Sequence, residues 1–237
     1  IAYYFSGGMI EDSLNTLTSH WGQYTPDNHQ AIFRSDVKLI NPKFILTADT
    51  LGYNTESYQS DLVGPTTILY EEETTILSTN GWYNTKSELS MLLDRSQVIH
   101  VDGMTLTGDT IYYDKAQGYG KCIGNIESVD STHSMTLYGH KAEMWESNNR
   151  AYVTDSAMLL DWSDSTTYTY MHADSLWTEE IPYQIYTLAE RDSILIDSIL
   201  TAQQPDTIWS DTTYQQLRAY RNVRIYRSDL QAVCDSA

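Results

Sequence analysis

Residues 106–114 read LTGDTIYYD, and the same pattern returns along the chain. The other copies are 17–24 (LTSHWGQY), 46–54 (LTADTLGYN), 77–84 (LSTNGWYN), 137–142 (LYGHKA), 171–177 (MHADSLW) and a truncated one at 227–232 (RSDLQA). Their polar centres fall at positions 20, 49, 80, 109, 140, 174 and 229. The spacing is about 30 residues, except for a last interval of about 55, and such self-similarity is typical of stacked repeat folds.

Each repeat carries a second strand-like segment about halfway along, most clearly GNIESV at 124–129. Polar turn segments separate the two kinds of segment, for example at 25–28, 114–118, 147–149 and 161–165. Strands of five to eight residues with turn signals about every 15 residues favour an all-β chain. Many Thr, Ile and Val residues, with 19 Tyr and 6 Trp, are consistent with this because such side chains pack well on a pleated surface.

Alternation along each strand predicts which side chains share a face. Val223 and Ile225 lie on one face with Arg224 on the other, and Val37 and Leu39 repeat that pattern around Lys38. The first strands predict one apolar column formed by Leu17, Leu46, Leu77, Leu106 and Leu137. A second column, five residues on, is formed by Leu51, Trp82 and Ile111. The small and polar step between the columns, as in Gly108-Asp109, predicts a bend or bulge that turns the strand.

Stacked units of this kind enclose one continuous apolar interior. We therefore expect a single domain over 1–237: an elongated, open β-jellyroll, or "β-taco", with a hydrophobic trough along its length. Residues 178–217 break the period and predict an insertion loop, in which 188–203 forms a short helix or an extra hairpin. The last repeat, at 226–237, is truncated.

The charge balance excludes two classes of partner. The chain has 14 basic and 32 acidic residues among 237, for a net charge of −18. Nucleic-acid binders carry a basic patch, and anionic membrane surfaces attract basic segments. This composition argues against both, while the acidity itself indicates a solubilising surface.

The cysteines and the first residues bear on the cellular compartment. Cys122 and Cys234 form no CxxC motif, which excludes a zinc ribbon, and either a disulfide or two free thiols fit the sequence. No apolar run is long enough to span a bilayer as a helix. The chain opens on the strand-like IAYYF without Met or a signal-peptide core, so we expect a piece of a longer or processed precursor.

The sequence predicts no catalyst. His20, His140 and His172 lie at or beside repeat centres where other copies carry Asp or Asn, which indicates polar bend residues. HExxH, GxSxG and P-loop motifs do not occur. The acidic runs at 71–73 and 179–180 fit a solvated surface better than a glycosidase pair. The recurring Asp of the repeat (Asp49, Asp109, Asp174, Asp229) satisfies backbone donors at a bend. No cofactor, metal or enzymatic activity is expected.

The repeat resembles the OstA-like family, the periplasmic lipopolysaccharide-transport proteins of the LptA type and the related amino-terminal domain of the outer-membrane translocon. The resemblance rests on the Leu-x-Gly/Ala-Asp-x-Ile/Leu-x-Tyr strand, the Gly-Asn-Ile strand halfway along and the spacing. It covers most of 1–177 and resumes at 218–237.

The resemblance implies a periplasmic carrier that shields the acyl chains of lipopolysaccharide and joins other jellyroll domains, or copies of itself, edge to edge. The side chains expected to meet lipid are Leu46, Leu51, Leu77, Trp82, Leu106, Ile111, Ile126, Leu137, Val223 and Ile225. Two rival hypotheses are a structural β-solenoid that binds protein or glycan and, more weakly, a carbohydrate-active β-helix enzyme.

Overall fold

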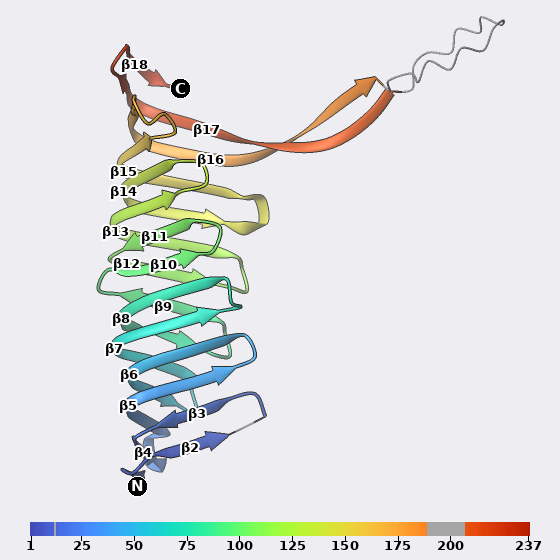
Figure 1. The fold of residues 1–237 in the computed structure, drawn as a ribbon. Coiled ribbons are helices and arrows are strands. Elements are labelled where there is room, and N and C mark those ends of the chain that lie inside the picture. The colour runs from blue at the N-terminus through green and yellow to red at the C-terminus, as the bar shows by residue number, and fades with distance from the viewer. Residues whose placement is uncertain (12, 189–206) are drawn as a thin grey trace, which may run out of the picture.

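The computed structural model describes residues 1–11, 13–188 and 207–237 (Figure 1), and its strands form one large antiparallel sheet. The strands are β1 (Ala2–Tyr4), β2 (Gly8–Glu11), β3 (Thr16–Ser19), β4 (Trp21–Thr25), β5 (Gln30–Asn41), β6 (Phe44–Asn54), β7 (Gln59–Tyr70), β8 (Thr74–Asn84), β9 (Leu89–Leu93), β10 (Ser96–His100), β11 (Met104–Gly108), β12 (Thr110–Asp114), β13 (Tyr119–Asp130), β14 (Met135–Trp145), β15 (Arg150–Asp161), β16 (Thr169–Leu188), β17 (Thr207–Arg227) and β18 (Leu230–Ser236). Two short 3-10 turns, η1 (Pro26–Asn28) and η2 (Glu146–Asn148), fall in predicted turn segments.

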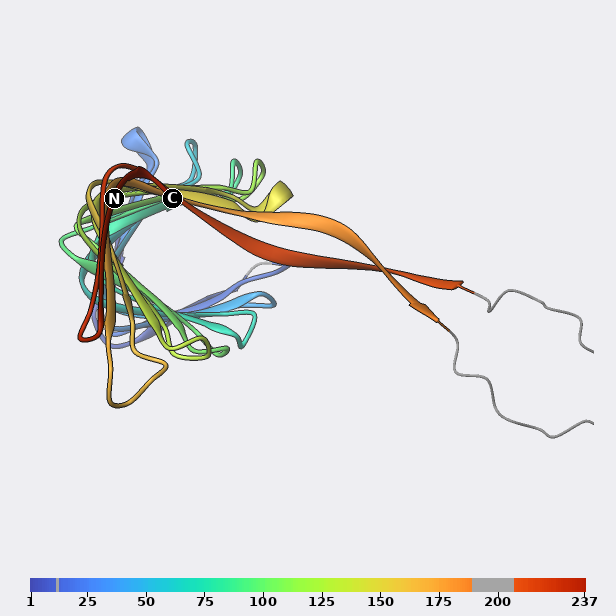
Figure 2. The same cartoon turned by 90° about the horizontal axis from the view of Figure 1, so that it is seen from above.

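The sheet is folded along its length into two walls (Figure 2). The first wall contains β2, β3, β10 and β11, together with the halves of the long strands that pair with them. The second wall contains β1, β4, β9 and β12 and the other halves. The walls meet at a bend on one side and diverge on the other, so one face of the sheet is concave. This arrangement confirms the predicted all-β open jellyroll.

Local backbone geometry produces the bend. Register shifts interrupt the pairing at the middle of the long strands, for example between Ala48 and Thr50 in β6 and between Ile123 and Ile126 in β13. Pairs of residues with positive φ lie there, such as Asp155 (61°) and Ser156 (66°) in β15. Bulges of this kind kink a strand, and Asn, Asp and Gly tolerate the left-handed region better than other residues. The polar step predicted from the sequence is therefore a real bend.

Small side chains fill the inside of the bend, where the two walls approach closely. Ala157, Ala173 and Val223 are fully buried there. Gly108 lies on the same line, and a Cβ at this position would come within 2.2 Å of the Cys122 Sγ atom. Because the close approach leaves no room for larger groups, the repeat carries a small residue before its polar centre.

The outside of the bend carries polar contacts that join successive strands. The Asn125 side-chain amide donates to Asp109 at 2.6 Å, and that of Asn222 donates to both Asp174 oxygens at 3.1 Å. In the first repeat His20 lies 3.1 Å from the Asp36 carboxylate. We call these contacts the bend locks. They confirm His20, Asp109 and Asp174 as polar bend residues, although these contacts run to side chains rather than to the predicted backbone donors.

Asn125 gives a test of the bend locks. Its φ is 43°, and we expect Asn125→Ala to lower the free energy of unfolding by about 1–2 kcal/mol, because alanine loses the amide contact and is disfavoured in this region. Asn125→Gly is the control, since it removes the same amide but tolerates positive φ. Urea denaturation measures both variants. Equal losses in the two would show that the left-handed backbone contributes nothing at this bend.

The loop conformation expected for the insertion 178–217 was wrong where the structure describes it. Residues 178–188 belong to β16 and residues 207–217 to β17, and the two strands pair continuously from Leu188↔Thr207 inward. They leave the second wall as a long two-stranded arm (Figures 1 and 2). The helix or hairpin expected at 188–203 falls, beyond Leu188, outside the described residues. Long strands with mixed side chains lack the period that marks the stack, so the sequence did not reveal the arm.

The last repeat copy was also aligned wrongly. Asp229 lies in the turn between β17 and β18 and pairs with Arg227 at 2.5 Å. The bend of β17 lies between Tyr220 and Val223, where Arg221 and Asn222 have positive φ. β18 then runs back along the first wall and just past the bend, and among the described residues no strand pairing is recorded on its other edge. Asp229 resembles the other copies only because a tight turn and a bend both favour Asp.

Candidate functional site

The concave face carries a continuous apolar column along the first wall. The cross-strand pairs place the following residues in one line: Ile10, Leu17, Leu39, Leu46, Ile68, Ile76, Val98, Leu106, Ser128, Leu137, Leu159, Met171, Ile225 and Ala232. Only Ser128 interrupts the apolar series. Since every strand on this wall contributes one member, the column runs from the first edge of the sheet to the last.

The second wall carries a matching column on the same concave face. Its members are Tyr4, Gly22, Phe33, Leu51, Leu62, Gly81, Leu92, Ile111, Cys122, Ala142, Val153, Leu176 and Ala219. Leu51 and Leu62 are each 1% exposed. The side chains of the two walls therefore cover each other near the bend, and the structure holds this part of the face closed.

Burial decreases from the bend toward the free margins of the walls. Ile76, Val98 and Leu106 are only partly buried although they pack against the buried cluster. Met104, one step further out, is 40% exposed. The apolar surface that remains accessible thus lies in the outer half of the concave face.

The structure brings most of the predicted lining residues onto this face. Leu46, Leu51, Ile111, Ile126 and Val223 are buried in the two clusters beneath it. Leu106, Leu137 and Ile225 are partly buried and pack against the same clusters. Whether any of them meets a lipid remains a prediction.

Leu77 and Trp82 were placed wrongly. Leu77 is 38% exposed, and its neighbour Ile76 occupies the column position opposite Ile68. Gly81 occupies the second column between Leu62 and Leu92, so alternation places Trp82 on the convex face. The copy at 77–84 is one residue shorter than the copy at 46–54, and aligning both on leucine shifted the register by one residue. Such a shift exchanges the two faces of a strand.

One described contact joins the two walls at their open side. Tyr70 ends β7 on the first wall, and Lys115 follows β12 on the second. The Lys115 ammonium donates to the Tyr70 hydroxyl, lies 4.5 Å from the ring centroid, and is 3.9 Å from the Glu71 carboxylate. Burial lowers the pKa of Lys115 from its ordinary value. This contact holds the margins of the walls together near the middle of the stack.

The two cysteines are both free thiols, and they differ in exposure. Cys122 is buried in the second column, and Cys234 is exposed on β18. Burial raises the pKa of the Cys122 thiol to about 11, and the Asp109 carboxylate adds to the effect. The sequence left a disulfide open as an alternative, and the structure shows two thiols instead.

The different surroundings of the two thiols predict different reactivities. The thiolate is the reactive form, and each unit of raised pKa lowers its population about tenfold. At pH 8 we expect Ellman's reagent to label Cys234 at least about 100-fold faster than Cys122, and the Cys122 rate should rise steeply toward pH 10. Peptide mass spectrometry assigns each label, with the urea-unfolded chain as control. Equal rates in the folded chain would contradict the closed concave face.

Within 1–11, 13–188 and 207–237, no group of three or more His, Cys, Asp or Glu side chains is placed to hold a metal ion. Across the same residues no helix is long and apolar enough to cross a membrane.

A folded-over antiparallel sheet with apolar columns along its concave face defines an open β-jellyroll of stacked repeats. The family model described as "OstA-like protein" matches residues 1–49. This match confirms the resemblance to the OstA-like, LptA-type family that the repeat motif indicated. A comparison with curated proteins gives no match.

Among solved structures, the chain is similar to LptH from Pseudomonas aeruginosa, the LptA homologous periplasmic component of the conserved lipopolysaccharide transport device. The TM-score is 0.44 at 18% sequence identity. The similarity covers 48% of this chain and 93% of LptH.

Proposed function

We propose that this protein is a non-enzymatic lipid carrier that shields the acyl chains of lipopolysaccharide on its concave face during transport across the periplasm to the outer membrane. The observation that carries the proposal is the apolar column of the first wall, which crosses every repeat from Ile10 to Ala232. If the column served only to pack the core, its side chains would all be buried. Ile76, Val98 and Leu106 instead remain partly exposed.

The energetics suit reversible capture. Burial of one methylene group is worth about 0.8 kcal/mol, so a few acyl chains laid along the face bind firmly. The walls are continuous only at the bend, and Tyr70 and Lys115 form a polar contact across the open side. Separating the margins therefore exposes the columns to a lipid without breaking the strand pairing. Transfer onward needs a neighbouring surface of similar affinity, since the carrier has no energy source.

The free edge formed by β18 supports a partner of the same architecture. Unpaired edges are a liability that many proteins cover, and a second sheet can pair with such an edge by β-augmentation. Leu230 and Val233 on this strand are 48% and 79% exposed. We propose that another jellyroll domain, or a second copy of this chain, continues the sheet there and extends the apolar columns.

Site-specific photo-crosslinking tests the lipid proposal. A benzoylphenylalanine at Leu106 or Ile76 faces the concave side, while one at Leu77 or Lys38 faces outward. Ile76 and Leu77 form a matched pair because they are adjacent in β8 and both apolar. With purified lipopolysaccharide we expect crosslinks from Ile76 and Leu106 at least about tenfold above those from Leu77 and Lys38. Labelling from the outward positions alone would refute the carrier proposal.

A further inference from the structure

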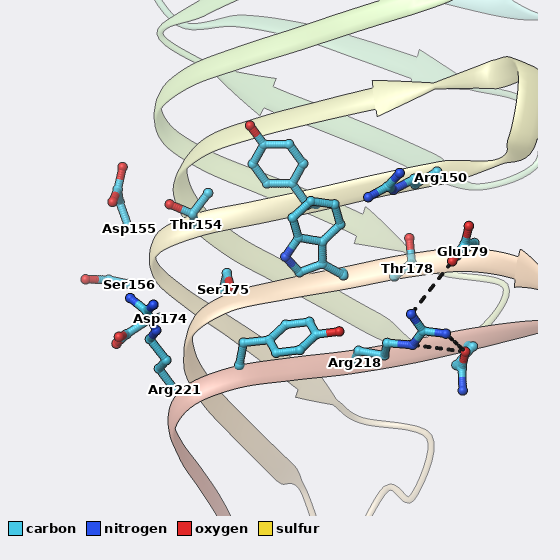
Figure 3. Close-up of a pocket in the computed structure, with 14 residues that line it drawn as sticks. Arg150, Thr154, Asp155, Ser156, Asp174, Ser175, Thr178, Glu179, Arg218 and Arg221 are labelled. Carbon is cyan, nitrogen blue, oxygen red and sulfur yellow. Dashed lines mark hydrogen bonds and ion pairs between the residues drawn. The ribbon is translucent and has the colours of Figure 1, made fainter. Parts of the chain in front are cut away.

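A hollow of about 950 Å³ lies on the convex side of the sheet, where the arm leaves the second wall (Figure 3). It is separate from the concave face because its lining side chains alternate with the members of the second column: Tyr152, Thr154, Ser175 and Trp177 flank Val153 and Leu176. Its volume is in the range of ligand pockets, which is roughly 300–1,000 Å³.

Aromatic side chains form one part of this hollow. Trp177 stacks on Tyr152, with ring centroids 4.6 Å apart and planes inclined by 21°. The row continues along the convex face through Trp145, Tyr119 and Tyr112, with centroid separations of 5.6 to 6.3 Å. These rings come from five successive strands, β12 to β16, which span about 19 Å at about 4.8 Å per strand. An extended ligand can therefore contact several rings.

The charged groups of the hollow form two mixed clusters. Figure 3 shows Arg150, Arg218 and Glu179 toward the arm and Arg221, Asp174 and Asp155 toward the bend. The Arg218 guanidinium is 4.0 Å from Glu179 and also donates to Gln216. Arg150 lies 4.7 Å from the Trp177 ring centroid. Neither Arg150 nor Arg221 forms an ion pair with a described carboxylate, so their donors are available to an anionic group.

We propose that this hollow binds an oligosaccharide that carries phosphate or carboxylate groups. Sugar hydroxyls both donate and accept, and they match the mixed lining of guanidinium, carboxylate, amide and hydroxyl groups. The rings of the aromatic row face one another and, at Trp177, the Arg150 guanidinium, so their edges are the apolar surface that they offer to the C–H groups of sugar rings. Arginine pairs with phosphate or carboxylate in bidentate fashion. The hollow contains three arginines, although the chain as a whole has only 14 basic residues and a net charge of −18. An acidic peptide fits less well, because it offers few hydroxyl groups to the carboxylate, amide and hydroxyl side chains of the lining.

The saccharide site on the convex side does not depend on lipid capture by the concave face. The experiment distinguishes the two because its ligand has no acyl chains. The probe is fully deacylated lipopolysaccharide, a phosphorylated oligosaccharide without acyl chains, and its dissociation constant is measured by calorimetry. Neutral maltoheptaose and an oligoglutamate peptide are the comparison ligands. We expect the phosphorylated probe to bind at least about tenfold more tightly than either, with affinity falling as salt is raised.

Arginine-to-glutamine variants inside and outside the hollow locate the binding. The double variant Arg150→Gln, Arg218→Gln should weaken probe binding at least about tenfold. Arg224→Gln, on the same strand as Arg218 but outside the hollow, should change it less than about twofold. Crosslinking of acylated lipopolysaccharide from Leu106 should stay unchanged in the double variant. If no saccharide binds saturably, if Arg224→Gln has the same effect, or if oligoglutamate binds as tightly, the saccharide site is refuted.

Discussion

Replacing Leu51 or Leu62 by alanine will lower the free energy of unfolding by about 3 kcal/mol, within the usual range of roughly 2–5 kcal/mol for buried leucines. Both side chains are 1% exposed and lie opposite each other in adjacent strands of the second wall. Truncation removes apolar contacts and leaves a cavity that the β-sheet backbone cannot close. Urea denaturation followed by circular dichroism measures the shift of the midpoint.

Leu77→Ala is the matched control for this prediction. It deletes the same atoms from a strand of the same sheet, but its side chain is 38% exposed on the convex face. We expect a loss of less than about 1 kcal/mol, since surface substitutions rarely cost more. A loss as large as that of Leu51→Ala would mean that the concave face is not the core of the protein.

Replacing Ile76 by aspartate will weaken acyl-chain binding at least about tenfold, the largest functional effect that we expect from a single substitution. Ile76 lies in the column of the first wall, between Ile68 and Val98, where its side chain stays partly accessible. A carboxylate there must lose its hydration when an acyl chain covers it, and that cost opposes binding. Crosslinking yield from a photoprobe at Leu106, measured against lipopolysaccharide concentration, gives the affinity.

Leu77→Asp places the same charge on the neighbouring residue but on the opposite face, and it should leave the affinity within about twofold of the parent. Circular dichroism and the urea midpoint establish that both variants fold. If Ile76→Asp does not fold, Val98→Thr, which keeps the side-chain volume and adds one hydroxyl, takes its place and should weaken binding by a smaller factor. Equal affinity in all these variants would separate lipid binding from the apolar column and overturn the proposed function.

Much of the architecture follows from local sequence. The polar centres at His20, Asp49, Asp109, His140 and Asp174 lie at the bend of the sheet, as the repeat predicted. A bulge with left-handed residues favours Asn, Asp and Gly for local reasons, so its signal repeats once per unit. The turns η1 and η2 were visible for the same reason, because they depend on a few neighbouring residues.

The register of pairing between strands could not be predicted from the sequence in the same way. The copy at 77–84 contains a leucine, a polar pair and a tyrosine at nearly the same offsets as its relatives, yet Ile76 and Gly81 take the inward positions. Alternation states which residues share a face but not which face is inward. That choice depends on the partner strand, and a slip of one residue reverses it.

The sequence by itself determined the repeat of about 30 residues, the two strands and polar bend of each unit, and the alternation that makes one face apolar. These properties depend on backbone preferences and side-chain periodicity within a few residues. Tertiary structure alone decided the register of β8, the pairing of β16 with β17 into an arm, and the hollow that gathers Tyr152, Trp177 and Arg218 on the convex side. Each of these depends on pairing between strands, as in Leu62↔Gly81, Tyr152↔Trp177 and Ser175↔Tyr220. A pattern within a few neighbouring residues does not contain the energies of such non-local contacts.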